Sequence, residues 1–442
     1  MRRSFRDRAG GRVAVVTVAC ITALALGSCS FTFGEPNDAS GGSATPSPPA
    51  GADALSPEAA AISAPGRLAV LGADGSLSTV RANGSGTHEL VGEEDDNLTA
   101  LQPAWSPQGD RLAWVVQQTR ESGISGAIAV SDPRGNDVVL VPTPFLPYYL
   151  SWSPTGDRVA FLGAGGQPDA PIEMGVLDLT RTPARARAVA GGDPFFYFAW
   201  APDGRRVIAH TGFDRLEELD LSGRATQVSA SPGLFATPAW SADGRTRVYA
   251  EGAPDGAQQL VAVVEDRPPR VLVEGRGALS FVLRPDGGAV AYQLLDEDEG
   301  DFFDRRATEP GDGVRVVDVR TGATRRATSI RAMTYWWSPD GERLLTLAPE
   351  PESAGAIPFL WQIWDGGRAE QAKGLHSPTI EVLRDYAPFF TQYAQSATPW
   401  APDGSAYAFP VAGPDGTGQI VVQEVGGEPV PVAEGVYVTW SP

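Results

Sequence analysis

The sequence predicts an all-β protein, an eight-bladed β-propeller of four-stranded antiparallel blades. A Trp-turn motif recurs eight times, with 40 to 63 residues between successive copies, and repeats of about that length are typical of propeller blades. Strand-like apolar runs such as Val159–Leu162 follow each complete copy. The 51 Gly and 38 Pro among 442 residues provide the turns that many short strands require.

Composition excludes several classes of protein. With 54 acidic and 35 basic residues the net charge is −19, so the chain should repel phosphate backbones and nucleic acid is not an expected partner. There are only three His and two Cys, and both Cys lie within the first 29 residues. A His-rich metal site, a zinc ribbon or a disulfide framework is therefore not expected.

Residues 1–28 are predicted to be a signal peptide of the lipoprotein type. Five Arg precede the apolar run Val13–Leu26, which is too short to span a bilayer and has the length of a signal core. The following Leu26–Cys29 resembles the bacterial lipobox. That resemblance implies export, lipidation of Cys29 by acyl chains such as palmitate, and anchoring at the extracytoplasmic face of the cell membrane. Ordinary signal cleavage is the alternative, and export by the Sec or the twin-arginine route is left open.

Residues 29–65 are expected to be the lipidated Cys and a disordered tether. The segment is rich in Ser, Pro, Gly and Ala and has no apolar periodicity. Residues 66–442 are then the propeller.

The WD-type repeat has a physical logic. An apolar strand ends in Trp, and Ser-Pro-Asp-Gly then makes a tight turn in which Pro presets φ and Gly takes a positive φ. A return strand and two further strands complete a sheet with two apolar faces, which only stacking against neighbours can bury. The Trp residues are predicted to be core between blades, with a Trp-lined ligand site as the alternative. They are Trp105, Trp152, Trp200, Trp240, Trp337, Trp400 and Trp440, and Leu283 takes the place of Trp in one copy.

The ring is predicted to close with strands from both chain ends. The last copy, Trp440–Pro442, lacks a return strand, whereas Gly66–Leu71 has the return-strand pattern and no Trp motif before it. One C-terminal strand and three N-terminal strands would form a single blade. Seven blades is the alternative, if the unit at Leu283 forms no blade of its own.

The motif W-[SA]-P-D-G followed by an apolar strand resembles the TolB-type propeller repeat, over about residues 66–442. The resemblance implies the fold and an envelope partner. The same repeat occurs in propeller domains of prolyl-oligopeptidase-like enzymes, whose hydrolase domain carries G-x-S-x-G. This chain has no such motif, so we expect no peptidase activity.

Because successive strands of a blade alternate in direction, their connections fall on two opposite faces of the ring. The Pro-Asp-Gly turns and the later Gly turns lie on one face, which we call the turn face. The long insertions fall on the other, the loop face, and insertions on one face often mark a binding surface. Because the tether enters at Gly66, the anchor should leave from the turn face and the loop face should point away from the membrane.

Two features of the loop face are candidate sites. The loop Leu294–Arg306 is acidic, and Asp296, Asp298, Asp301 and Asp304 could hold calcium, although Gly300 departs from the EF-hand spacing. A solvated acidic loop is the alternative, and the same two interpretations apply to Glu93–Asn97. The second feature is Ser377–Tyr393, predicted to be a helix capped by Ser377 and ended by Pro388. Its aromatic residues either plug the channel or bind a partner, and they are Tyr386, Phe389, Phe390 and Tyr393.

The remaining titratable residues form no visible catalytic set. His210 is expected to be buried, and Asp178, Asp220 and Asp318 are expected to cap turns. The sequence thus favours a monomeric envelope lipoprotein that needs no cofactor and binds a protein or glycan without catalysis. A carboxylate-dependent polysaccharide lyase or glycosidase is the alternative, and a sensor or assembly subunit is a third possibility.

Overall fold

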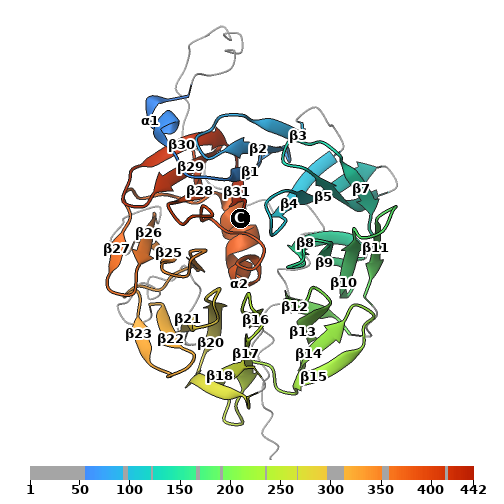
Figure 1. The fold of residues 1–442 in the computed structure, drawn as a ribbon, viewed down its shortest axis with the longest axis vertical. Helices are drawn as coiled ribbons and strands as arrows, with labels where there is room; N and C mark the ends of the chain where they lie inside the picture. The colour runs from blue at the N-terminus through green and yellow to red at the C-terminus, as the bar shows by residue number, and fades with distance from the viewer. Residues whose placement is uncertain are drawn as a thin grey trace, which may run out of the picture. The chain divides into compact units, whose positions relative to one another are not determined.

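The structure is a computed structural model that describes residues 55–92, 98–120, 123–165, 170–189, 193–233, 236–265, 267–295, 313–350, 358–413 and 417–442. In these residues it is an eight-bladed β-propeller, as predicted (Figure 1). All eight sheets belong to one compact unit, residues 54–165 and 171–442.

Blade 1 combines both chain ends. Its strands are β31 (Tyr437–Trp440), β1 (Arg67–Leu71), β2 (Leu77–Arg81) and β3 (His88–Val91). Leu68 pairs with Trp440 and Val70 with Val438 in an antiparallel register. The predicted closure is therefore confirmed.

Blades 2 to 5 follow in chain order. Blade 2 has β4 (Leu98–Trp105), β5 (Leu112–Arg120), β6 (Gly123–Ser131) and β7 (Val139–Pro142). Blade 3 has β8 (Leu146–Trp152), β9 (Arg158–Ala164), β10 (Ile172–Asp178) and β11 (Arg185–Ala188). Blade 4 has β12 (Phe195–Trp200), β13 (Arg206–Thr211), β14 (Arg215–Asp220) and β15 (Ala225–Ser229). Blade 5 has β16 (Ala239–Trp240), β17 (Thr246–Gly252), β18 (Gln258–Val264) and β19 (Arg270–Gly275).

Blades 6 to 8 complete the ring. Blade 6 has β20 (Ala278–Leu283), β21 (Ala289–Leu295), β22 (Arg315–Asp318) and β23 (Thr324–Arg326). Blade 7 has β24 (Thr334–Trp337), β25 (Leu344–Pro349), β26 (Phe359–Trp364) and β27 (Ala369–Gln371). Blade 8 has β28 (Ala406–Ala412), β29 (Gly418–Glu424) and β30 (Pro429–Glu434).

Two of these blades test finer points of the prediction. The unit at Leu283 forms a four-stranded sheet of its own, so the seven-blade alternative is wrong. Blade 8 has three strands, and its first strand is reduced to one bridge between Trp400 and Tyr407. The chain reaches that position directly from a helical insertion, which leaves little extended backbone before Trp400.

The turn of the repeat is held by its own side chains, also in blade 2, where its sequence is Ser-Pro-Gln-Gly. In blade 2, the hydroxyl of Ser106 accepts the backbone N–H of Arg111 at 3.0 Å and donates to Asp110 at 2.7 Å. Gly109 has a φ of 68° and donates its N–H to Ser106 O, a backbone conformation that costs glycine little. The turn therefore fixes how each first strand leads into its return strand.

The Trp residues link one blade to the next, as predicted. Five indole Nε1 groups donate a hydrogen bond to a backbone carbonyl oxygen of the preceding blade. The acceptor is in each case the residue that precedes the Trp, or the Leu in its place, of that blade's own motif. The pairs are Trp105–Thr439, Trp152–Ala104, Trp200–Ser151, Trp337–Val282 and Trp400–Trp336. This bond sets the register of neighbouring blades at five of the eight junctions.

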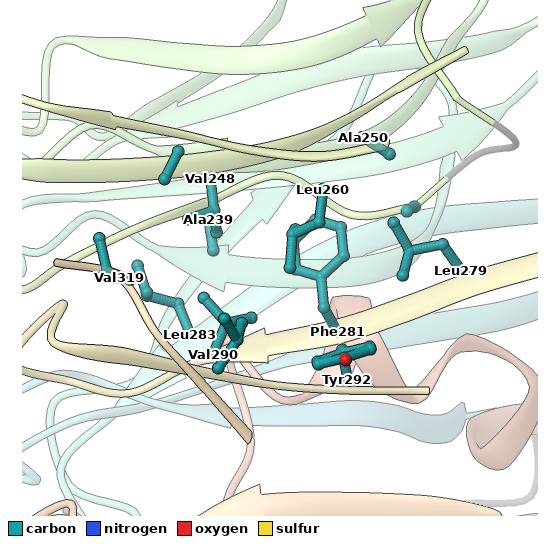
Figure 2. Packing of buried hydrophobic residues seen from close by; sticks show 13 residues of the cluster. Ala239, Val248, Ala250, Leu260, Leu279, Phe281, Leu283, Val290, Tyr292 and Val319 are labelled. Atoms are coloured by element: carbon teal, nitrogen blue, oxygen red, sulfur yellow. The ribbon is translucent and has the colours of Figure 1, made fainter. Parts of the chain in front are cut away.

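The hydrophobic core lies between adjacent blades. Figure 2 shows the junction of blades 5 and 6, where Val248 and Leu260 face Phe281 and Val290. Val248, Leu260 and Val290 are fully buried. Each sheet thus buries apolar side chains against its neighbour, because a single blade could not cover them alone.

The N-terminal end of the described chain differs from the expected tether. Residues 57–61 form a short helix, α1 (Pro57–Ala61), with Ser56 Oγ accepting the N–H of Ala59. Ile62 is buried in the core between blades 8 and 1. Pro65 O accepts a hydrogen bond from Trp440 Nε1 at 2.8 Å. A cap, a proline in the first turn and one buried side chain order this stretch before the first strand begins.

Candidate functional site

A helical segment lies at the centre of the ring (Figure 1). It follows β27 and contains a π-turn η5 (Val382–Tyr386), a 3-10 turn η6 (Ala387–Phe389) and α2 (Phe390–Tyr393). The segment begins at Ile380, three residues after the predicted cap Ser377.

Pro388 does not end this helix, and that prediction is wrong. The N–H of Ala387 bonds to Val382 O across the wider π-turn, and a new 3-10 turn starts with Pro388 in its first positions. Proline is tolerated there because its missing N–H has no partner to lose. The helical segment therefore continues as far as Tyr393.

Gln392 ties the segment to the ring. Its side chain is 3% exposed. The Nε2 group donates to Phe198 O and to the hydroxyl of Tyr149, both at 2.9 Å, while Oε1 accepts the N–H of Phe198 at 2.9 Å. The hydroxyl of Tyr149 also donates to Gln392 O at 3.0 Å. One glutamine thus bonds to β8 and β12.

The predicted aromatic residues pack toward the inner strands, with one exception. Tyr386 stacks on Tyr437 of β31, with centroids 3.8 Å apart and planes at 14°. Tyr393 donates to Gln102 Oε1 of β4 at 2.8 Å. Phe390 contacts Tyr335 of β24, with centroids 4.8 Å apart.

Phe389 is the exception and is only half-buried. Burial raises the pKa of Tyr386 and of Tyr393 well above the ordinary value, so both hydroxyls stay neutral at physiological pH. This arrangement is that of a channel plug, with Phe389 as its least covered aromatic side chain.

A small cavity of about 80 Å³ lies beside the segment. Most of its lining is apolar and aromatic, and Thr334, Trp361 and His376 are among the residues that line it. Thr334 Oγ1, Trp361 Nε1 and His376 Nε2 are buried and have no hydrogen-bond partner among the described residues. Burial lowers the pKa of His376, and its ring packs on Phe409 with centroids 4.7 Å apart. A neutral imidazole, a hydroxyl and an indole N–H in apolar walls can orient a small polar group.

The loop face also exposes apolar side chains. Phe213 is 67% exposed and Ile380 62% exposed, and both lie in second-to-third-strand or inter-blade connections. Leu375 lies in the same inter-blade connection as Ile380, and Ile124 is exposed at the start of β6. Exposed apolar side chains on a rigid frame are the kind of contact that partner surfaces use.

Several predicted residues serve structure. Asp220 accepts from the N–H and the hydroxyl of Ser222, and Asp318 does the same for Thr321. These bonds lower the pKa of both carboxyls. Asp178 caps its turn through Thr180. His210 is buried, with Nε2 3.1 Å from Ala236 O. Both expectations, capped turns and a buried histidine, are confirmed.

Other predicted site residues lie outside the described residues. Cys29 precedes them, and the candidate calcium ligands Asp296, Asp298, Asp301 and Asp304 fall between residues 295 and 313. In the described ranges, no three His, Cys, Asp or Glu side chains gather as a metal site would require. Nor does that part of the chain contain a helix with the length and apolar character needed to cross a bilayer.

Sequence reasoning missed Gln392, Thr334 and Trp361. Their roles depend on where an insertion in blade 7 places its side chains, and no local motif signals that. The only hint was the unusual spacing of 63 residues between Trp337 and Trp400.

Comparison with known proteins supports the fold. No family model matches the chain, and no curated protein matches it. Among solved structures, a eukaryotic initiation factor is 12% identical, with 85% of this chain and 98% of the other covered and a TM-score of 0.51. An oligogalacturonate lyase in complex with manganese is 16% identical over 76% of this chain and 86% of the other, at a TM-score of 0.47. TolB from Acinetobacter baumannii is 14% identical over 75% and 83%, at 0.38. The likeness to these structures extends to the fold alone.

Proposed function

We propose that this protein is an exported, lipid-anchored β-propeller whose loop face binds an envelope protein or glycan without catalysing a reaction. The observation that carries the proposal is the central helical segment. It fills the axis of the ring and bonds to inner strands of several blades. A filled axis turns the loop face into a continuous, rigid surface on which a partner can dock.

The position of the N-terminal segment supports the proposed orientation. Pro65 and Arg67 bond to Trp440 and Ser441, which belong to the turn face. A tether that ends there would leave the loop face free to point away from the membrane. The exposed residues Phe213 and Ile380 lie on that outward face.

Photo-crosslinking in intact cells would test the partner surface. A photoreactive phenylalanine analogue at Phe213 or Ile380 should give a discrete crosslinked product. The matched control is Val425, which is also exposed but lies in a hairpin on the turn face, and there the same analogue should not give that product. Equal crosslinking at all three positions would contradict a partner surface on the loop face.

Turnover assays would separate binding from catalysis. The full chain would be incubated with acidic oligosaccharides, with and without manganese or calcium, and unsaturated or shortened products would be measured. We expect no turnover. Metal-dependent cleavage would replace the binding proposal with the lyase or glycosidase alternative.

A further inference from the structure

A second pocket lies on the turn face, away from the central segment. It has a volume of about 650 Å³ and lies between blades 1 and 2. Its walls come from the segment before β1, the turn after β2 and the turn between β6 and β7. Pockets of 300–1,000 Å³ are typical of small-molecule sites.

Three arginines converge on this pocket: Arg67, Arg81 and Arg134. Burial, together with the charges of Arg81 and Arg134, lowers the pKa of Arg67. Within the described ranges, none of the three forms an ion pair. A cluster of three cations beside a single carboxylate is unexpected in a chain of net charge −19, since like charges held together oppose folding.

The fold holds these charges in place. Arg67 donates from Nη2 to Thr79 O at 2.9 Å and to Gly86 O at 2.6 Å. The hydroxyl of Thr79 donates in turn to Pro133 O, next to Arg134. Thr79 therefore holds both the guanidinium of Arg67 and the turn that carries Arg134. The site is thus preorganised before a ligand binds.

One carboxylate, that of Asp132, lies among the lining residues. It is used within its own turn, where Oδ1 accepts the N–H groups of Arg134 and Asn136, both at 2.8 Å. Three guanidinium groups and one carboxylate leave a formal charge of about +2. A phosphate monoester carries about −1.5 to −2 at pH 7, and its oxygens match the forked donors of arginine.

We propose that this pocket binds a phosphate monoester. The same chemistry is offered by a soluble ligand such as sn-glycerol 3-phosphate and by a lipid headgroup such as that of phosphatidic acid. The proposal concerns the turn face and is independent of the partner surface on the loop face. Attraction to phosphate here is local and opposes the repulsion expected from the net charge.

Calorimetric titration would test the site. The full chain, kept in an uncharged maltoside detergent, would be titrated with sn-glycerol 3-phosphate, short-chain phosphatidic acid and acetate. We expect the phosphates to bind, with an affinity that falls as salt rises, and acetate to bind at least tenfold more weakly. No binding of either phosphate, or equally strong binding of acetate, would overturn the proposal.

Arginine variants provide the decisive comparison. The double variant Arg81→Gln, Arg134→Gln should raise the Kd for both phosphates at least tenfold. The matched control is Arg205→Gln, which removes an exposed charge from a turn on the same face and far around the ring. Thermal unfolding in the absence of phosphate checks that both proteins are folded. Equal losses of affinity in the double variant and the control would also overturn the site.

The two phosphates distinguish the source of the ligand. Tighter binding of phosphatidic acid than of sn-glycerol 3-phosphate, lost in the double variant, would support a lipid headgroup. Equal binding of both would support the soluble ester.

Discussion

The indole Nε1 of Trp105 donates a hydrogen bond to the carbonyl oxygen of Thr439, 3.2 Å away, across the junction of blades 1 and 2. The two residues are 334 positions apart in sequence. The same bond joins Trp152 to Ala104 in the next junction. The junction between blades 1 and 2, to which both ends of blade 1 contribute, therefore has the same inter-blade bond as four other junctions of the ring.

Replacement of Trp105 by Phe should destabilise the ring. The change removes a buried hydrogen bond and part of an inter-blade side chain, so we expect a loss of about 1–3 kcal/mol in the free energy of unfolding. Urea unfolding of the full chain would measure it. The control is Trp240→Phe, since Trp240 Nε1 has no partner among the described residues. Equal losses would mean that the inter-blade bond contributes nothing measurable.

Gln392→Ala should be among the more costly polar substitutions. It would leave the N–H and the carbonyl oxygen of Phe198 without their side-chain partner in a buried site, at a cost of about 2–4 kcal/mol. The hydroxyl of Tyr149 would lose the amide group but keep its bond to the backbone carbonyl of residue 392. Gln395→Ala is the control, because Gln395 is exposed and makes one bond to Pro238 O. Amide hydrogen exchange at Phe198 should accelerate in the first variant and stay unchanged in the second.

The two adjacent phenylalanines of the central segment should differ sharply. Phe390 is buried against Tyr335, so Phe390→Ala should cost about 3–5 kcal/mol. Phe389 is half-buried, and Phe389→Ala should cost about 1 kcal/mol. Thermal unfolding would rank the two variants. A reversed order would show that the segment is not packed in the channel in this way.

Acidification should destabilise the protein through His210. Burial lowers the pKa of this imidazole to about 4, from 6.5, so the unfolded chain binds its proton more readily than the folded chain does. The contribution of His210 is present above pH 6.5 and is lost as the pH falls from 6.5 towards 4, and it amounts to about 3 kcal/mol. His210→Gln should flatten the stability profile in that window. An unchanged slope would mean that the folded protein accommodates the charged imidazole.

The ring could be predicted because its signal is local and repeated. The unit at Leu283 lacks the Trp but keeps the Pro-Asp-Gly turn, and this turn was enough to predict a blade there. The closure could be predicted because Gly66–Leu71 has the pattern of a return strand but no Trp motif before it, whereas the last Trp motif, Trp440–Pro442, has no return strand after it. Both inferences need only the order of strands within a blade.

The central segment could be predicted only in part. Its aromatic residues and helical spacing were visible, but Pro388 misled because a π-turn before it changes the hydrogen-bond register. The bonds of Gln392 join strands more than 190 residues away, and no local pattern encodes such a distance. The cluster of Arg67, Arg81 and Arg134 was missed for the same reason, since each arginine looks like an ordinary exposed charge at the end of a strand or in a turn.

The closure of blade 1 also has a consequence for biosynthesis. Because Tyr437–Trp440 follows every other strand of the described residues, a ribosome or a translocating pore releases this second partner of β1 after the other blade strands. Until then the polypeptide is an open arc with an unpaired strand edge at β1, a template for wrong pairing between copies. Deletion of Tyr437–Trp440 should therefore produce an aggregating chain rather than a working one.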